Sequence, residues 1–343
     1  MNCVAKLVKI TEISLTVIGI FPLDVAQFYP NKRIESGEFY TFATIMGRKA
    51  ITLDEQIALL RSRGMIITDE NKAKEVLFDV GYFRLGFYWF PFETDYPNKH
   101  HRSHLFKGDA NFDNAVRLYY FDFNLRNILL KPLSRIEIAF RTKVAYLVSN
   151  ANVNSPTWFA DTAVVSRQQA NSFKSKVYDQ ILKKSPLIAL HHRHHINDKF
   201  APAWKTLEFM TLGEVVHLFK SIKDERIKSE VAKCFGINKL VTFQNYLDLI
   251  KNLRNTCAHG NVLYDFSPEK SIRKGPAMMK GVGENQNLNG ALRVVLYMMK
   301  QVSVNRYNEL LADIDALIEK YGAFPEVHHI LTTISGLNEL HRK

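Results

Sequence analysis

Residues 112–149, FDNAVRLYYFDFNLRNILLKPLSRIEIAFRTKVAYLVS, carry the longest periodic pattern of apolar residues in the chain. Apolar side chains recur there at mixed steps of three and four residues, which is the period of one face of an α-helix. They are Val116, Tyr119, Phe123, Ile128, Leu133, Ile136, Phe140 and Val144. The pattern predicts one long helix, or two helices bent near Pro132, because proline disrupts hydrogen bonding in a helix interior.

Three arginines, Arg126, Arg135 and Arg141, lie on the same segment together with Glu137. Glu137 precedes Arg141 by four residues, the favourable order for an ion pair along a helix, and this favours a solvated helix face. A basic stripe that binds RNA is the alternative interpretation of the three arginines.

Helical signals continue on both sides of this segment. Thr52 with Glu55 resembles a capping box, Gly81 and Gly236 follow two further helical patterns, and residues 291–320 are amphipathic. We therefore predict an all-α fold with little or no sheet. The aromatic run at 82–92 is more typical of core than of a base-stacking surface.

Three segments are expected along the chain. Residues 48–265 form a helical domain, and residues 266–343 add a loop and C-terminal helices that pack on it. Residues 1–47 form an extension of different composition, either an authentic strand or arm, or a segment before the true start at Met46.

Composition limits the class of protein. The 343 residues are 46% hydrophobic, and 46 Lys and Arg against 34 Asp and Glu give a net charge of +12, which favours a polyanionic partner such as RNA. Three dispersed cysteines indicate a reduced, cytoplasmic protein. The apolar stretch at 13–21 is too short to span a bilayer, so we expect no membrane association and no secretion.

One hexapeptide, Arg254-Asn255-Thr256-Cys257-Ala258-His259, near the end of a predicted helix at 240–259, could carry chemistry. Arginine binds phosphate through a forked cationic group, and histidine transfers protons near neutral pH. A helical wheel places Arg254 within the apolar arc and about 140° from His259. Asn255 falls about 40° from His259 and is expected to bond to it.

The separation of Arg254 and His259 indicates that one unbroken helix makes a poor site. Either the helix unwinds before Gly260, or a second copy completes the site across a two-fold axis, which is the interpretation we prefer. In such a site one imidazole would take the 2′-OH proton of RNA and Arg254 would hold the phosphate. A structural arginine with a capping histidine is the competing interpretation.

Four histidines cluster at 191–195 around Arg193. They lack a carboxylate or cysteine at the spacing of helical metal sites, so we expect a surface cluster, no metal site and no cofactor.

Three blocks of sequence resemble the Abi-like abortive-infection proteins, the AbiD/AbiF-like group of phage-defence factors. These blocks are Gly81–Leu85 through Phe92, Phe121–Arg126 with Arg135–Glu137 and Arg141, and Pro202–Glu208 leading to Leu253–His259. The group is similar to the HEPN superfamily, whose ribonuclease signature, R-x4-H with Asn second, matches Arg254, Asn255 and His259.

The resemblance implies a HEPN-like helical bundle, a homodimer-built site, metal-independent RNA cleavage and a toxin-like role in phage defence. It also implies that a small non-coding RNA could act as regulator. A non-catalytic RNA-binding module that holds such an RNA is the alternative from another class.

Overall fold

The fold is that of a computed structural model, which describes residues 50–100, 102–278 and 286–337. The predicted extension at 1–47 lies outside these ranges. Contacts divide the chain into two units that meet in sequence between Tyr82 and Phe83, inside the segment 48–265 that was expected to be one domain. Each unit is considered by itself.

The described part of the first unit holds two helices, α3 (Leu53–Ser62) and α4 (Glu70–Val80). The capping box predicted at the start of α3 is present, since Thr52 Oγ accepts from the Glu55 amide while Glu55 accepts from the Thr52 amide. Helix α4 ends at Gly81, whose φ of 91° is a conformation that glycine adopts without steric cost.

The second unit is built around one helix, α6 (Phe112–Ala151), which is about 60 Å long at 1.5 Å per residue. The helix runs through Pro132 without interruption, which confirms the prediction of one long helix rather than two. Pro132 is buried, and packing along both halves of α6 offsets the backbone hydrogen bond that proline cannot donate.

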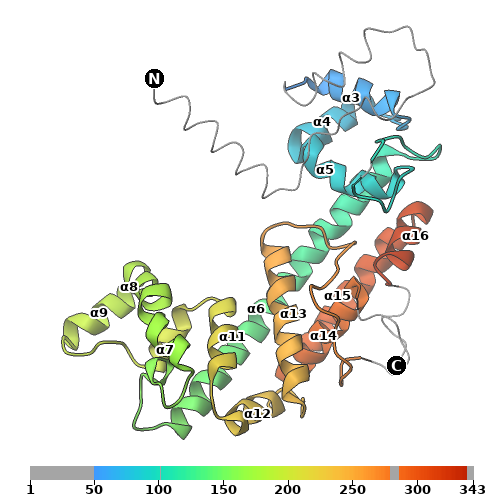
Figure 1. Cartoon of the computed structure of the whole chain (residues 1–343). Coiled ribbons are helices and arrows are strands. Elements are labelled where there is room, and N and C mark those ends of the chain that lie inside the picture. The colour runs from blue at the N-terminus through green and yellow to red at the C-terminus, as the bar shows by residue number, and fades with distance from the viewer. Residues whose placement is uncertain (1–49, 101, 279–285, 338–343) are drawn as a thin grey trace, which may run out of the picture. The chain divides into compact units, whose positions relative to one another are not determined.

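Four helices after residue 239 lie along or near α6 (Figure 1). They are α13 (Leu240–Ala258), α14 (Leu288–Val302), α15 (Val304–Gly322) and α16 (Pro325–Thr333). The single amphipathic helix expected at 291–320 is two helices, because extended backbone at Ser303, with φ −164° and ψ 120°, ends α14. The Ser303 hydroxyl then caps α15 by accepting from the Arg306 amide.

The remaining helices of the second unit are shorter. Before α6 come α5 (Tyr82–Trp89) and the 3-10 turn η2 (Phe90–Phe92). After α6 come η3 (Trp158–Ala160), α7 (Arg167–Phe173), the π-helical turn η4 (Lys174–Tyr178), α8 (Asp179–Lys184), α9 (Pro186–His194), α10 (Ala203–Thr206), η5 (Leu207–Phe209), α11 (Leu212–Ser221) and α12 (Glu225–Lys233).

Aromatic side chains join these helices to the core. Phe140 of α6 contacts Phe219 of α11 and Phe243 of α13 edge to face, with ring centroids 5.4 and 6.0 Å apart. Of the aromatic run at 82–92, the second half is buried, whereas Phe83 and Phe87 are 66% and 46% exposed. The core prediction therefore holds for part of that run only.

The all-α prediction is confirmed. Apart from helices, the described ranges contain two isolated antiparallel bridges, Glu93 with Phe106 and Val165 with Ile222, and no strand. Across the same ranges, every helix is too short or too polar to pass through a lipid bilayer.

Candidate functional site

Helix α13 carries the Arg254–His259 motif at its C-terminal end. Its predicted apolar arc is buried as expected: Phe243, Tyr246, Leu247, Ile250, Leu253 and Cys257. Cys257 lies inside the motif, and its burial raises the pKa of the thiol to about 12. Because a neutral, buried thiol is unreactive, the chemistry of the motif falls to its other side chains.

Arg254 lies at the border of the buried arc and keeps 33% of its side chain exposed. Its Nε lies 3.6 Å from Glu137 Oε2 of α6, and its Nη1 donates to Asn255 Oδ1 at 3.2 Å. The wheel placed this guanidinium on the apolar side; the structure shows instead that it meets a carboxylate from α6 and still reaches solvent. The Glu137 carboxylate therefore offsets the cost of placing the Arg254 charge beside the apolar core.

Asn255 and His259 are both exposed at the end of α13. His259 is the C-cap residue, and its backbone amide donates to the Asn255 carbonyl at 3.0 Å. The expected bond between their side chains is not among the hydrogen bonds of the described residues, where Asn255 Oδ1 accepts from Arg254. The imidazole is therefore left facing solvent, available to a ligand.

Side chains of other helices hold the loop that follows His259 at four backbone positions. Arg84 Nη1 donates to the Gly260 carbonyl at 2.8 Å, and Arg126 Nη1 donates to the Asn261 carbonyl at 3.1 Å. Asp122 accepts from the amides of Leu263 and Tyr264 at 2.6 and 2.9 Å. These contacts, called here the 260–264 clamp, fix where α13 ends and so where His259 is presented.

Asp122, the centre of this clamp, is fully buried, with Arg126 Nη1 3.8 Å from its Oδ2. Desolvation raises the pKa of this carboxyl to about 7, although the two amide donors and Arg126 act in the opposite direction. Sequence analysis included Asp122 in the block Phe121–Arg126 that carries the family resemblance but gave it no role. The available signal was an acid four residues before Arg126 within the most periodic helix of the chain.

Glu137 links Arg254 to the interior of the bundle. The predicted ion pair with Arg141 is present at 2.7 Å, but the Glu137 and Arg141 side chains are only 12% and 11% exposed, so the face that was expected to be solvated is largely covered. Arg141 also donates to the Met210 carbonyl at 3.0 Å, just before α11. One carboxylate thus serves two arginines, one inside the bundle and one at the motif.

The three arginines considered for RNA binding separate into two groups. Arg126 and Arg141 are 5% and 9% exposed and donate to protein carbonyls, so they cannot contact RNA while the bundle is folded. Arg135 is exposed on α6. A stripe of three exposed arginines is therefore absent from α6, and RNA contact stays a prediction for Arg135 alone.

The histidine cluster lies at the end of α9. His191 is buried with Nε2 3.2 Å from Asp198 Oδ2, and burial lowers the pKa of its imidazole. His192 Nε2 lies 2.7 Å from the hydroxyl of Tyr178. Within the described ranges no three His, Cys, Asp or Glu side chains are arranged to hold a metal ion.

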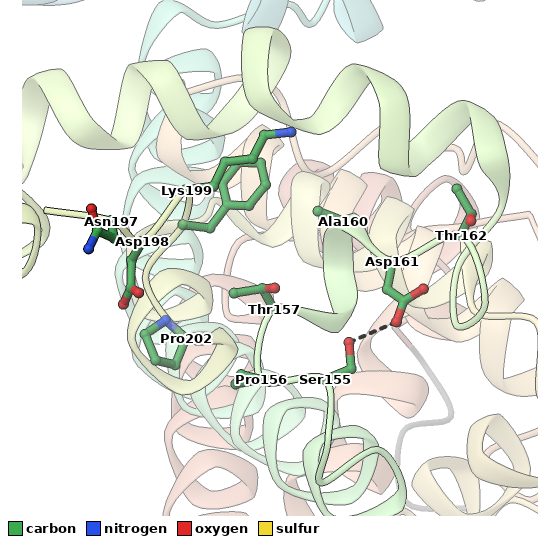
Figure 2. A pocket seen from close by; sticks show the side chains of 11 residues that line it. Ser155, Pro156, Thr157, Ala160, Asp161, Thr162, Asn197, Asp198, Lys199 and Pro202 are labelled. Carbon is green, nitrogen blue, oxygen red and sulfur yellow. Dashed lines mark hydrogen bonds between the residues drawn. The ribbon is translucent and has the colours of Figure 1, made fainter. Parts of the chain in front are cut away.

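A pocket of about 610 Å³ lies beside this cluster (Figure 2). Asp198 and Lys199 lie on one wall, and Thr157 and Asp161 lie on the other. Asp161 already accepts a hydrogen bond from Ser155 Oγ at 2.8 Å. Two carboxylates and one lysine do not match a phosphate ligand, and the motif residues do not line this pocket.

Comparisons with known proteins give one match. A family model described as "Abi-like protein" matches residues 75–265, more than half of the chain, and this range includes α6 and the motif on α13. No curated protein and no solved structure matches significantly.

Proposed function

The chain belongs to the Abi-like family, whose members act in abortive infection as a defence against phage, and we propose that it does so as an endoribonuclease of HEPN type. The observation that carries the proposal is the end of α13, where Arg254 and His259 are both solvent-accessible and the adjoining loop is fixed by the buried carboxyl of Asp122. An exposed pair on a rigid support is what an RNA-cleaving site requires.

Each side chain has a distinct task in this mechanism. The imidazole of His259 takes the proton from the ribose 2′-OH, which attacks the adjacent phosphorus while the bond to the 5′-oxygen breaks. Arg254 holds the phosphate and stabilises the charge that develops on it. The products are a 2′,3′-cyclic phosphate and a 5′-hydroxyl end, and DNA is resistant because it lacks the 2′-OH.

A second copy of the chain supplies the acid that protonates the leaving 5′-oxygen. Arg254 and His259 are separated by about 7.5 Å along α13 and lie on different faces of it, so one helix does not converge on one phosphate. A two-fold arrangement brings a second His259 and a second Arg254 to the same cleft. The proposed active species is accordingly a homodimer.

Glu137 sets the position of Arg254 in this scheme. Its carboxylate lies 3.6 Å from the guanidinium and is anchored by the buried Arg141. A contact of this length leaves the remaining N–H donors of Arg254 for phosphate. Asn255, which accepts from the same guanidinium, limits its rotation further.

The decisive experiment compares the wild-type protein with His259→Ala on labelled single-stranded RNA in the presence of EDTA. Wild-type protein is expected to produce cyclic-phosphate ends, and the variant is expected to lose cleavage while keeping its circular dichroism spectrum and its oligomeric state. His329→Ala, which removes an exposed histidine from α16, is the matched control and is expected to cleave normally.

Cleavage by His259→Ala at the wild-type rate would refute the proposed role of the motif. A salt-sensitive complex of the wild-type protein with RNA that is never cleaved would favour the non-catalytic RNA-binding module instead. Loss of wild-type cleavage on chelation would contradict the metal-independent mechanism.

A further inference from the structure

A second hollow, of about 240 Å³, lies along α13 and is separate from the pocket of Figure 2. Its walls come from α13, from Lys220 near the end of α11, and from the loop that includes Pro268 and Lys270. Enclosed sites for small molecules usually measure about 300–1,000 Å³. A hollow below that range suits one unit of a longer chain rather than a whole enclosed ligand.

The hollow and His259 share one face of α13. Asp248, Asn252, Asn255 and His259 recur at steps of four, three and four residues, which aligns them along the helix. Asp248 and Asn252 line the hollow. Asn252 precedes His259 by seven residues, roughly 10 Å along the axis. A polymer bound at the hollow can therefore extend directly to the imidazole.

The charges at the hollow favour an anionic polymer. Lys220 is compensated by Asp248 at 2.5 and 2.7 Å, whereas Lys251 and Lys270 take part in none of the ion pairs of the described residues. Glu269 is the other acid in the wall, so two uncompensated cations face one carboxylate. The Asn252 amide adds donors and an acceptor that can bond to a base or a ribose.

The outer wall is fixed before any ligand arrives. Asn245 of α13 donates through Nδ2 to the Ser271 carbonyl at 3.1 Å and accepts from the Arg273 amide at 2.8 Å. Both polar ends of this amide therefore attach the loop to the helix. The distance between Lys270 and α13 is set by the fold, which favours a preformed site.

We infer that this hollow is an RNA subsite in which Lys251, Lys270 and Asn252 hold a nucleotide on one side of the scissile phosphate and align the strand with His259. The inference rests on the proposed ribonuclease function, since it assigns that site its strand path. Lysines contact the phosphates and Asn252 contacts the nucleotide between them.

The test measures RNA binding without cleavage. Full-length His259→Ala protein is titrated with a fluorescent single-stranded RNA over a range of salt concentrations, with and without Lys251→Gln and Lys270→Gln. Loss of two phosphate contacts to a single strand should make the slope of log K against log salt shallower by about 1.4. Lys183→Gln with Lys184→Gln, two exposed lysines of α8, is the matched control and should leave the slope unchanged.

A third variant separates the amide from the charges. Asn252→Ala in the same background should weaken binding at every salt concentration without changing the slope, because no charge is removed. Unchanged slopes in the Lys251/Lys270 variant, equal losses in the α8 control, or no RNA binding by the parent would each overturn the inference. Cleavage by wild-type protein compared with His259→Ala tests the proposed function separately, so the two can fail independently.

Discussion

Asp122→Asn tests whether the 260–264 clamp contains a carboxyl that titrates near neutral pH. The side chain is fully buried, accepts from two backbone amides and lies 3.8 Å from Arg126. Burial raises its pKa from the usual 3.8 to about 7. Asparagine has almost the same shape and cannot ionise. Its Nδ2 replaces one of the two oxygens that accept from the loop amides, which lowers stability equally at every pH, so the pH dependence of the difference isolates the proton.

The direction in which stability changes with pH follows from the difference between the folded and unfolded pKa values of Asp122. Because the folded-state pKa lies above the unfolded one, the stabilising contribution is complete below about pH 4 and is lost as the pH rises through about 7. The separation between 3.8 and about 7, at about 1.4 kcal/mol per pH unit, corresponds to roughly 4 kcal/mol in total. Between about pH 5 and about pH 8, roughly 2.5 kcal/mol of this should be lost.

Urea unfolding of both proteins across this pH range, followed by tryptophan fluorescence and circular dichroism, measures the difference in free energy. We expect the wild-type protein to lose stability relative to Asp122→Asn as the pH rises. Asp313→Asn, an exposed carboxyl of α15, controls for the loss of one carboxylate. If the difference in unfolding free energy did not change with pH, or if the wild-type protein gained stability relative to Asp122→Asn as the pH rose, the prediction would be wrong. Arg126 and the amide donors would then lower the pKa of Asp122 more than burial raises it.

Two further substitutions test the support of the motif. Glu137→Gln should destabilise the fold by about 3 kcal/mol, the low end for breaking a buried pair, because Arg141 loses its partner at 2.7 Å and keeps only the exposed Glu208 at 3.9 Å. Arg254→Gln, which removes the partly exposed member of its pair, should cost about 0–1 kcal/mol, and similar urea midpoints for the two variants would contradict this difference. Gly260→Ala should lower stability by about 1–2 kcal/mol because φ is 67° there. Gly86→Ala in α5, where a Cβ meets nothing closer than 3.8 Å, should instead raise stability by about 0.5–1 kcal/mol. Thermal unfolding should therefore give a lower melting temperature for Gly260→Ala and a higher one for Gly86→Ala than for the wild-type protein.

Local signals predicted the helices well because they act within a few residues. The Thr52 capping box, the stop at Gly81 and the buried arc of α13 depend on spacing that the sequence displays directly. Ser303 was missed because residues on both sides of it keep an amphipathic period, and only its extended backbone separates α14 from α15. Periodicity does not reveal such a break.

The sequence identified the candidate site residues Arg254, Asn255 and His259 but did not predict the contacts that their side chains make. Spacing on a wheel put Asn255 beside His259, yet Asn255 bonds to Arg254, whose guanidinium also meets the carboxylate of Glu137 from α6. The same wheel cannot report that the Glu137 side chain is only 12% exposed, since helices distant in sequence cover it.

The sequence by itself determined that the protein is helical, that α6 is its longest element and that Arg254, Asn255 and His259 stand together. Helical period and motif spacing are local properties and need no partner. Only the tertiary structure decided that Arg126 and Arg141 make their contacts inside the bundle and that Asp122 fixes the loop after His259. It also decided that a hollow lies along α13 beside Asp248 and Asn252. Which side chains are buried depends on which segments meet in space, and a buried charged group is stable only with a partner.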